Sequence, residues 1–233
     1  MELSKRLQAV AELVGCHDVV ADVGTDHGYI PIYLLKQGKC KRAFAMDVNE
    51  GPLLRAKEHL DAYGLQNQVE LRLSDGVKKL SIGECDCVVI AGMGGGLTIK
   101  ILEEGKDIFQ NLNEFVLQPQ SEIGKVRKYL LESGYCIVDE DMIFEDGKFY
   151  PMMKVVKEES SPYQECELKY GKHLLVQRHP ILKLFLEKEF HKKRKILDML
   201  EQQQGSHIEE RKIEIKKELE GIEYALQRYY EDN

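Results

Sequence analysis

The sequence predicts an α/β fold with a doubly wound, mostly parallel sheet, and three observations support this prediction. Apolar segments rich in β-branched residues alternate with amphipathic helical segments over residues 3–157. The first apolar segment, 19–23, leads into a glycine-rich turn at 24–28 and then into a helical pattern. The last two segments flank a turn at 145–148, which indicates a hairpin and therefore one antiparallel strand in the sheet.

The expected elements follow each other closely along the chain. Ser4 can cap a first helix at 3–14, because its side-chain oxygen can accept from the free amides of the first turn. Strands are expected at 19–23, 43–46, 69–73, 87–91, 114–117, 135–144 and 149–157. Helices are expected between them at 29–37, 51–63, 97–104 and 122–132. Five strand–helix units closed by a hairpin match the Rossmann-like, seven-stranded sheet of AdoMet-dependent methyltransferases.

The character of the chain changes near residue 157. A polar linker at 157–164 separates a first domain, 1–160, from a second, 161–233. Two long helices are expected in the second, at 181–203 and 207–230. The spacing typical of a coiled-coil seam is followed in the last helix by Ile215, Leu219, Ile222, Leu226 and Tyr229. We therefore expect an antiparallel coiled-coil hairpin that closes within one chain, and hence a monomer.

The first arm of this hairpin, 183–195, is basic. It holds six lysine and arginine residues against two glutamates, so its net charge is six minus two, or +4. The pattern fits two interpretations: a solvated helix face, or a surface that grips the phosphates of a nucleic acid. On the second interpretation Lys192 and Arg194 bind the substrate.

Composition narrows the class of protein. Of the 233 residues, 43% are hydrophobic and 31% are charged, which indicates a globular domain. No apolar run approaches the roughly 20 residues that span a bilayer, and the first residues lack a signal peptide, so we expect a cytosolic protein without membrane contact. The six cysteines are scattered and are expected to be reduced thiols, with no metal site. The net charge of −7 argues mildly against a nucleic-acid partner, although the basic residues are segregated.

Polar and glycine residues follow the first four predicted strands. The carboxyl ends of parallel strands share one edge of the sheet, so these residues should gather around one ligand. Asp47 stands where a carboxylate can accept both ribose hydroxyls, and Asp75 where it can accept from an adenine amino group. Met93 can pack on the adenine or on a methionine chain. The predicted cofactor-binding residues are Asp22, Gly24, Gly28, Asp47, Asp75, Gly76, Ala91, Gly92 and Met93.

The acidic character of the first turn distinguishes between two nucleoside cofactors. NAD needs its pyrophosphate at a helix N-terminus, and the carboxylates of Asp22 and Asp26 would repel two phosphate charges there. AdoMet brings a sulfonium and an α-ammonium group, which carboxylates attract. The turn therefore favours AdoMet over NAD.

Several short motifs carry a more specific resemblance. They are the run 21–31 (Asp-x-Gly-x-Asp-His-Gly-Tyr-x-Pro from its second residue), the segments 3–7, 91–95 and 117–120, and the coiled-coil tail. Together they resemble the bacterial tRNA (adenine-22-N1)-methyltransferase family over essentially the whole chain. The resemblance implies AdoMet as methyl donor, N1 of an adenine in the D-arm region of tRNA as acceptor, and a tail that helps to hold the tRNA.

An adenine-N1 acceptor suggests roles for residues around the turn. Asp26 replaces a glycine of the common methyltransferase turn, so it can stabilise the cationic product near N6 or accept a proton. Tyr29 can stack on an extruded base. His27 either supports the residues that contact the substrate or caps the helix. Pro119 can shape the acceptor pocket and Arg6 can hold a phosphate or the base. We expect Asp26 and Tyr29 to be catalytic and the other three to contact the substrate.

Two other functions compete with this one. The chain can be an AdoMet-dependent methyltransferase of a protein or small molecule, or an AdoMet-binding protein whose coiled coil drives assembly. The loop Asn/Asp-Pro-Pro-Tyr of exocyclic-amine methyltransferases is absent after the fourth strand, where 91–94 reads Ala-Gly-Met-Gly. By analogy between families, this favours a ring nitrogen as acceptor.

Overall fold

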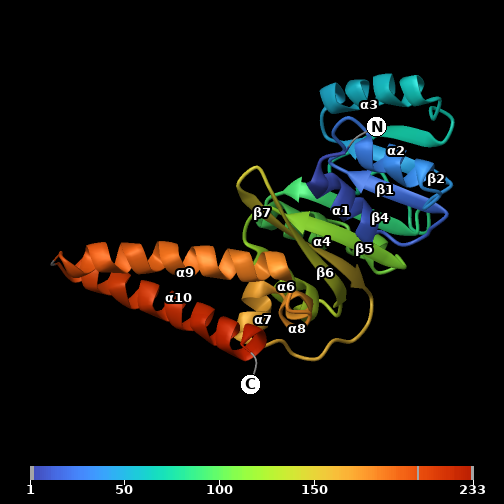
Figure 1. Cartoon of the computed structure of the whole chain (residues 1–233). Helices are drawn as coiled ribbons and strands as arrows, with labels where there is room; N and C mark the ends of the chain where they lie inside the picture. Colours follow the sequence, from blue (N-terminus) through green and yellow to red (C-terminus); the bar gives the residue numbers. More distant parts are fainter. Residues whose placement is uncertain (1–2, 204, 232–233) are drawn as a thin grey trace. The chain divides into compact units, whose positions relative to one another are not determined.

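The computed structural model describes residues 3–203 and 205–231 and places seven strands in one sheet (Figure 1). The strands are β1 (Val19–Val23), β2 (Arg42–Asp47), β3 (Val69–Leu73), β4 (Cys87–Met93), β5 (Glu114–Pro119), β6 (Cys136–Glu145) and β7 (Lys148–Val156). Their order across the sheet is β3-β2-β1-β4-β5-β7-β6. The first five strands in that order are parallel to one another, whereas β7 is antiparallel to both of its neighbours. The predicted doubly wound fold is thereby confirmed.

The central strands are apolar along their length because both faces of the sheet are covered. All six residues of β5 are buried, as are the first four of β4. Such continuous runs are typical of parallel strands that are packed between helices. The chain winds outward from β1 in one direction and from β4 in the other. The crevice that this reversal creates lies at the carboxyl ends of β1 and β4.

Six helices accompany the sheet. They are α1 (Lys5–Leu13), α2 (Tyr29–Lys36), α3 (Glu50–Tyr63), α4 (Gly95–Glu104), α5 (Lys106–Phe109) and α6 (Ile123–Glu132). Helix α2 contacts α1 and α3, while α4 contacts α5 and α6. Buried Val10, Ile32 and Val116 belong to one cluster that joins α1 and α2 to the strands. The sequence does not predict α5, because four residues are too few to show a helical period.

The hairpin of β6 and β7 turns on two residues. Asp146 and Gly147 both have positive φ, 50° and 79°, and Glu145 pairs with Lys148 across the turn. Asp-Gly is favoured in two-residue turns with this backbone conformation, whose twist matches that of the strands. The predicted hairpin at 145–148 therefore forms for the expected reason.

The chain divides into a unit that ends at Pro162 and a unit that begins at Tyr163. The second unit contains α7 (Glu165–Tyr170), α8 (Lys172–Val176), α9 (Pro180–Glu201) and α10 (Ser206–Tyr230). Helices α9 and α10 pack against each other as the predicted hairpin, with Leu197 clustered against Ile215 and Leu219. None of the described helices has both the length and the apolarity needed to cross a lipid bilayer.

Two details of the second unit differ from the prediction. A helical hairpin alone was expected after residue 161, but 165–176 forms two short helices before it. Near the end of α10 the buried position is Ala225, whereas Leu226 and Tyr229 are half-buried. Helix α10 also contacts α8, so its buried face is not set by the seam with α9 alone.

Candidate active site

The backbone of the turn after β1 lies very close to neighbouring elements. Gly24 and Thr25 donate their amides to the carbonyl of Met46 on β2, at 2.8 Å each. Gly24 has φ of +77°, and a Cβ there would collide with the side chain of Met93 at the end of β4. Gly28 has φ of +66° and approaches α3 closely. Both positions therefore favour glycine for backbone conformation, and the close packing on Ala56 favours it at Gly28 for space as well.

Asp22 is the buried carboxyl group of this turn. It is 4% exposed at the end of β1. Burial raises the pKa of Asp22 to about 7, with the Thr25 hydroxyl lowering it in part and the charge of Asp47 raising it further. An ammonium or sulfonium ligand would offset the cost of ionising Asp22, because an opposite charge favours the charged form.

A cavity of about 120 Å³ opens beside Asp22. It is lined by Arg6, Leu7, Asp22, Gly24, Asp26, Tyr29, Ile30 and Ala91. The structure thus brings together three predicted cofactor-binding residues and three residues predicted to contact or act on the substrate. The cavity lies at the switch point between β1 and β4, where open α/β sheets bind their ligands.

Asp26 lies at the open side of this cavity, with its side chain 67% exposed. Arg55 on α3 donates from Nη2 to Oδ1 of Asp26 at 3.0 Å, and Nε2 of His27 is 3.4 Å from the same oxygen. Asp26 is therefore an oriented carboxylate with basic neighbours.

Tyr29 stands in a group of three aromatic rings. The ring centroids of Tyr29 and His27 are 5.2 Å apart, and those of Tyr29 and His59 are 5.1 Å apart, with nearly parallel planes. His59 Nδ1 is 2.9 Å from the carbonyl of His27, whose φ of +63° is unusual for a residue other than glycine. Tyr29 lines the cavity and so offers a flat ring there on which a base can stack.

Arg6 reaches the site from α1 and is held by groups distant in sequence. Its Nη1 donates to Oε1 of Gln118 at 3.0 Å, and the amide of Gly92 donates to the same oxygen at 3.2 Å. Gln118 is completely buried. The first amides of α1, those of Lys5 and Arg6, donate to the carboxylate of Glu145 at 2.7 and 3.2 Å. The hairpin of β6 and β7 thereby anchors the start of α1. Gln118 fixes the direction of the Arg6 side chain.

The remaining predicted residues lie at other strand ends. Pro119 ends β5, is buried and pairs with Met93 across the β4–β5 ladder. Asp47 ends β2, and its Oδ1 accepts from the amide of Asn49 at 2.8 Å. Gly76 follows β3 with φ of +57°.

Asp75 is engaged away from the cavity. It is exposed and forms an ion pair with Lys78, which holds the pKa of Asp75 below its usual range. Lys78 is also 2.9 Å from Glu104. A role for Asp75 in accepting from an adenine amino group would need this pair to open.

Lys192 and Arg194 belong to the second unit and lie on α9, where both are exposed. Lys192 is 3.6 Å from Glu189, and Arg194 is 3.7 Å from Asp198. Exposed pairs of this kind are weak and are screened by salt, so both cations can exchange their partner for a phosphate.

Comparison with known proteins agrees with this geometry. A family profile described as a methyltransferase domain matches residues 3–153. The tRNA (adenine(22)-N(1))-methyltransferase of Bacillus subtilis is 39% identical over 153 residues, which span 66% of this chain and 64% of that protein. The aligned part is thus just under two thirds of the length of this relative.

Two solved structures extend the similarity to the whole chain. The m1A22 tRNA methyltransferase TrmK of B. subtilis has a TM-score of 0.85 at 29% identity, covering 97% of this chain and 99% of that one. Sp1610 of Streptococcus pneumoniae, assigned as a tRNA (m1A22) methyltransferase, is 30% identical with a TM-score of 0.86, covering 97% of this chain and 100% of that one. The chain belongs to the tRNA (adenine-22-N1)-methyltransferase family. The Sp1610 crystal structure is a complex with S-adenosyl-L-methionine.

The residues of this family member fit that cofactor. Asp22 offers a buried carboxyl to a cationic group, and Asp47 offers a second one at the neighbouring strand end. The absence of a side chain at Gly24 lets the turn and Met93 approach each other closely beside the cavity. These features suit a cationic nucleoside and do not suit a pyrophosphate.

Four residues that shape the site have no assigned role in the sequence analysis: Arg55, His59, Gln118 and Glu145. Arg55 and His59 lie one helical turn apart on α3, and that spacing places them on one face. This spacing can be seen in the sequence, but it does not show that the helix face contacts the turn after β1. Gln118 and Glu145 act on Arg6 from more than a hundred residues away, which no local pattern can indicate.

Proposed function

We propose that this chain transfers a methyl group from AdoMet to N1 of adenine-22 in tRNA. The observation that carries the proposal is the shared cavity, in which the cofactor-type residues Asp22 and Gly24 lie beside Arg6, Asp26 and Tyr29 at its open side. Membership of the family supplies the acceptor, since B. subtilis TrmK acts on this nucleotide.

The proposed roles follow from charge and position. When bound, AdoMet supplies an electrophilic methyl group on a sulfonium. Asp22, once ionised, binds the cationic methionine part, and Asp47 accepts from the ribose hydroxyls. Adenine N1 carries an in-plane lone pair at neutral pH and needs no base to become a nucleophile. The contribution of the protein is therefore mainly alignment of the two reactants.

Asp26, Tyr29 and Arg6 act on the acceptor. Methylation at N1 gives the adenine a positive charge, which the carboxylate of Asp26 stabilises from the open side of the cavity. Tyr29 stacks on the extruded base, because an adenine within a helical stem has to leave its stack before N1 is accessible. Arg6, held by Gln118, binds the base or a neighbouring phosphate.

We assign the second unit to tRNA binding, with Lys192 and Arg194 on α9 contacting phosphates. The exposure of both cations supports this role. A monomer that works in the cytosol completes the proposal.

Methyl transfer to paired tRNA transcripts tests the proposal. One transcript carries adenine at position 22, and the matched control carries guanine there. With labelled AdoMet, we expect label only in the adenine-22 transcript. Equal labelling of both transcripts would move the acceptor to another nucleotide. No labelling of either, with AdoMet still bound, would leave a protein or small molecule as the substrate.

A further inference from the structure

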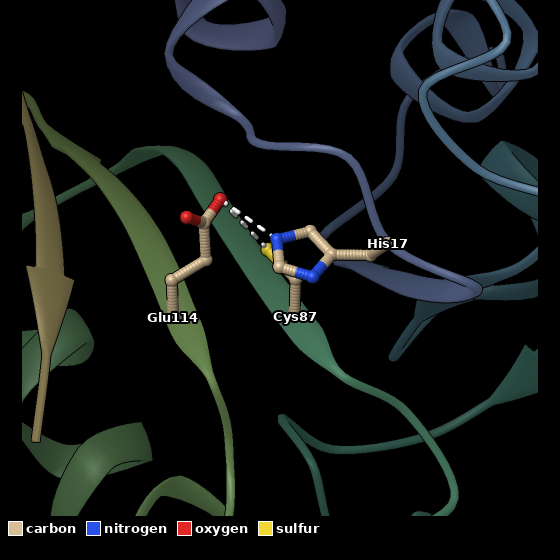
Figure 2. A group of neighbouring side chains, drawn as sticks. All are labelled: His17, Cys87 and Glu114. Atoms are coloured by element: carbon tan, nitrogen blue, oxygen red, sulfur yellow. Dashed lines mark hydrogen bonds and ion pairs between the residues drawn. The ribbon is translucent and has the colours of Figure 1, made fainter.

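A second group of chemically active side chains lies at the amino-terminal edge of the sheet, at the opposite ends of the strands from the crevice. His17 is in the segment between α1 and β1, Cys87 begins β4 and Glu114 begins β5. Figure 2 shows their side chains converging. One ligand atom from each lies within 4.8 Å of the others. His17 Nε2 is 3.0 Å and Cys87 Sγ is 4.0 Å from Oε1 of Glu114.

The cluster is buried, and one of its atoms is unsatisfied. The His17 side chain is 9% exposed and that of Glu114 is 11% exposed, while Cys87 is fully buried. Despite its short distance to Glu114, Nε2 of His17 makes no hydrogen bond of acceptable geometry with any described residue. The contact of Nε2 with Glu114 is close but lacks hydrogen-bond geometry, which points to a missing neighbour at the centre of the group.

We propose that His17, Cys87 and Glu114 bind a divalent transition-metal ion of the zinc class. An imidazole nitrogen, a thiolate and a carboxylate are the donors that Zn²⁺ takes in proteins, whereas Mg²⁺ and Ca²⁺ avoid sulfur. Ligands at about 2.0–2.3 Å from a tetrahedral zinc ion lie about 3.3–3.8 Å from each other. The distances between the ligand atoms, 3.0 Å, 4.0 Å and at most 4.8 Å, bracket this range. Small side-chain rotations would therefore bring all three atoms to bonding distance from one ion. The fourth position is left for water.

Neighbouring groups hold the ligands in place. The amide of Gly15 donates to Oε1 of Glu114 at 2.6 Å, and the amide of His17 donates to the carbonyl of Lys39 at 2.9 Å. Such contacts orient the ligands before an ion arrives. Lys154 approaches the other oxygen of Glu114, with Nζ 3.5 Å from Oε2, and so leaves Oε1 facing His17 and Cys87.

The charges of the two anionic ligands offset that of the ion. The ion displaces the thiol proton of Cys87 to solvent and meets a thiolate, an ionised Glu114 and neutral His17. With Lys154 nearby, the occupied site carries one positive charge in excess.

The site is accessible and has a structural consequence. A surface cavity of about 350 Å³, lined in part by Cys16, His17 and Asp86, gives a path to the imidazole. A bound ion would fasten the segment after α1 to β4 and β5. Since α1 carries Arg6 at its other end, the ion stabilises the frame of the active site without touching the reactants.

Titration of the metal-free full chain with Co²⁺ tests this site directly. We expect one Co²⁺ per chain, with the thiolate-to-cobalt charge-transfer band and the strong d–d bands of tetrahedral coordination. Cys87→Ser should lose the charge-transfer band. Cys85→Ser should keep it, since this buried thiol lies only two positions away and is the matched control. His17→Gln and Glu114→Gln should each weaken binding by at least about tenfold.

Thermal unfolding with and without Zn²⁺ gives an independent measurement. Zn²⁺ should raise the Tm of the wild type and of Cys85→Ser, but not that of His17→Gln. The His17→Gln substitution leaves the buried strands unaltered, so this comparison can be made even if Cys87→Ser folds poorly. The proposal is overturned when the wild type shows no charge-transfer band, or when the band persists in Cys87→Ser. A Tm that rises equally in His17→Gln would also contradict it.

Discussion

Arg55 donates a hydrogen bond to Asp26 across 3.0 Å and so ties α3 to the turn after β1. The two side chains are 46% and 67% exposed, so the pair adds little to the stability of the fold. Its effect is on orientation: one carboxylate oxygen is fixed at the open side of the cavity that holds Asp22 and Tyr29.

Replacing Asp26 with alanine should stop catalysis without emptying the cofactor site. We expect kcat for methyl transfer to fall by about 100-fold or more, because the developing charge on the adenine loses its counter-charge. The Kd for AdoMet should change by no more than several-fold. Single-turnover kinetics and calorimetric titration measure the two quantities separately.

Asp18→Ala is the matched control for this variant. Asp18 is also an exposed aspartate next to a basic side chain, that of Lys41 at 2.7 Å, and it lies at the other end of β1. It should leave kcat unchanged. Near-normal turnover in Asp26→Ala would remove Asp26 from the mechanism.

Asp22 should make AdoMet binding depend on pH. Because burial raises its pKa to about 7, a proton has to leave before the carboxylate can meet a cationic ligand. The association constant should rise roughly tenfold per pH unit below that value and level off above it. Titrations between pH 5 and 9 with the wild type and with Asp22→Asn check this, and a flat wild-type profile would contradict it.

The same group should destabilise the free protein as pH rises. Between the ordinary value of 3.8 and about 7 the folded chain keeps a proton that the unfolded chain has lost. The free energy of unfolding therefore falls across this window and stays reduced above it. Asp22→Asn removes the effect, so its Tm without AdoMet should exceed that of the wild type at pH 8, with the difference shrinking toward pH 4.

Gly24→Ala should weaken AdoMet binding by at least about tenfold, because its Cβ enters the space shared with Met93 and the strained φ of +77° distorts the turn. Gly38→Ala is the control: its φ is +67°, but a Cβ there meets nothing within 4 Å. Both variants carry similar backbone strain, so both should lose stability by denaturant unfolding, but the contact with Met93 acts in Gly24→Ala alone. Equal AdoMet affinities in the two variants would show that close approach at Gly24 has no importance.

Binding of tRNA should weaken steeply with salt. If Lys192 and Arg194 each neutralise one phosphate, replacing either with alanine lowers the slope of log K against log salt by about one. Lys125→Ala serves as control, because Lys125 is also exposed and paired three positions from a glutamate, but on α6. Filter binding between low and physiological salt measures the slopes. Unchanged slopes would mean that the basic face of α9 is only solvated and does not bind tRNA.

Much of the fold follows from the sequence because its signals are local. The run 87–91 is apolar throughout, and a strand buried on both faces needs nothing more to be recognised. The same holds for Asp146-Gly147, whose turn conformation is set by two residues. Short helices such as α7 and α8 escape prediction because their stability comes from packing and not from a long periodic pattern.

The site was predictable where its residues share one strand end and unpredictable where they meet through the fold. Asp22, Gly24 and Asp26 lie in one turn, and their chemistry could be read from the order of residues. Gln118 reaches Arg6 only because β5 ends beside α1. The group of His17, Cys87 and Glu114 likewise depends on sheet order, so the expectation of no metal site, drawn from the spacing of the cysteines, could not take it into account.

Nucleoside mass spectrometry can show whether methylation occurs at N1 of adenine-22. Unmodified tRNA is incubated with the purified protein and AdoMet, digested to nucleosides, and in parallel cut into fragments that locate the new mass. We expect a single new nucleoside, 1-methyladenosine, in the fragment that contains position 22. N6-methyladenosine, or 1-methyladenosine at another position, would contradict it.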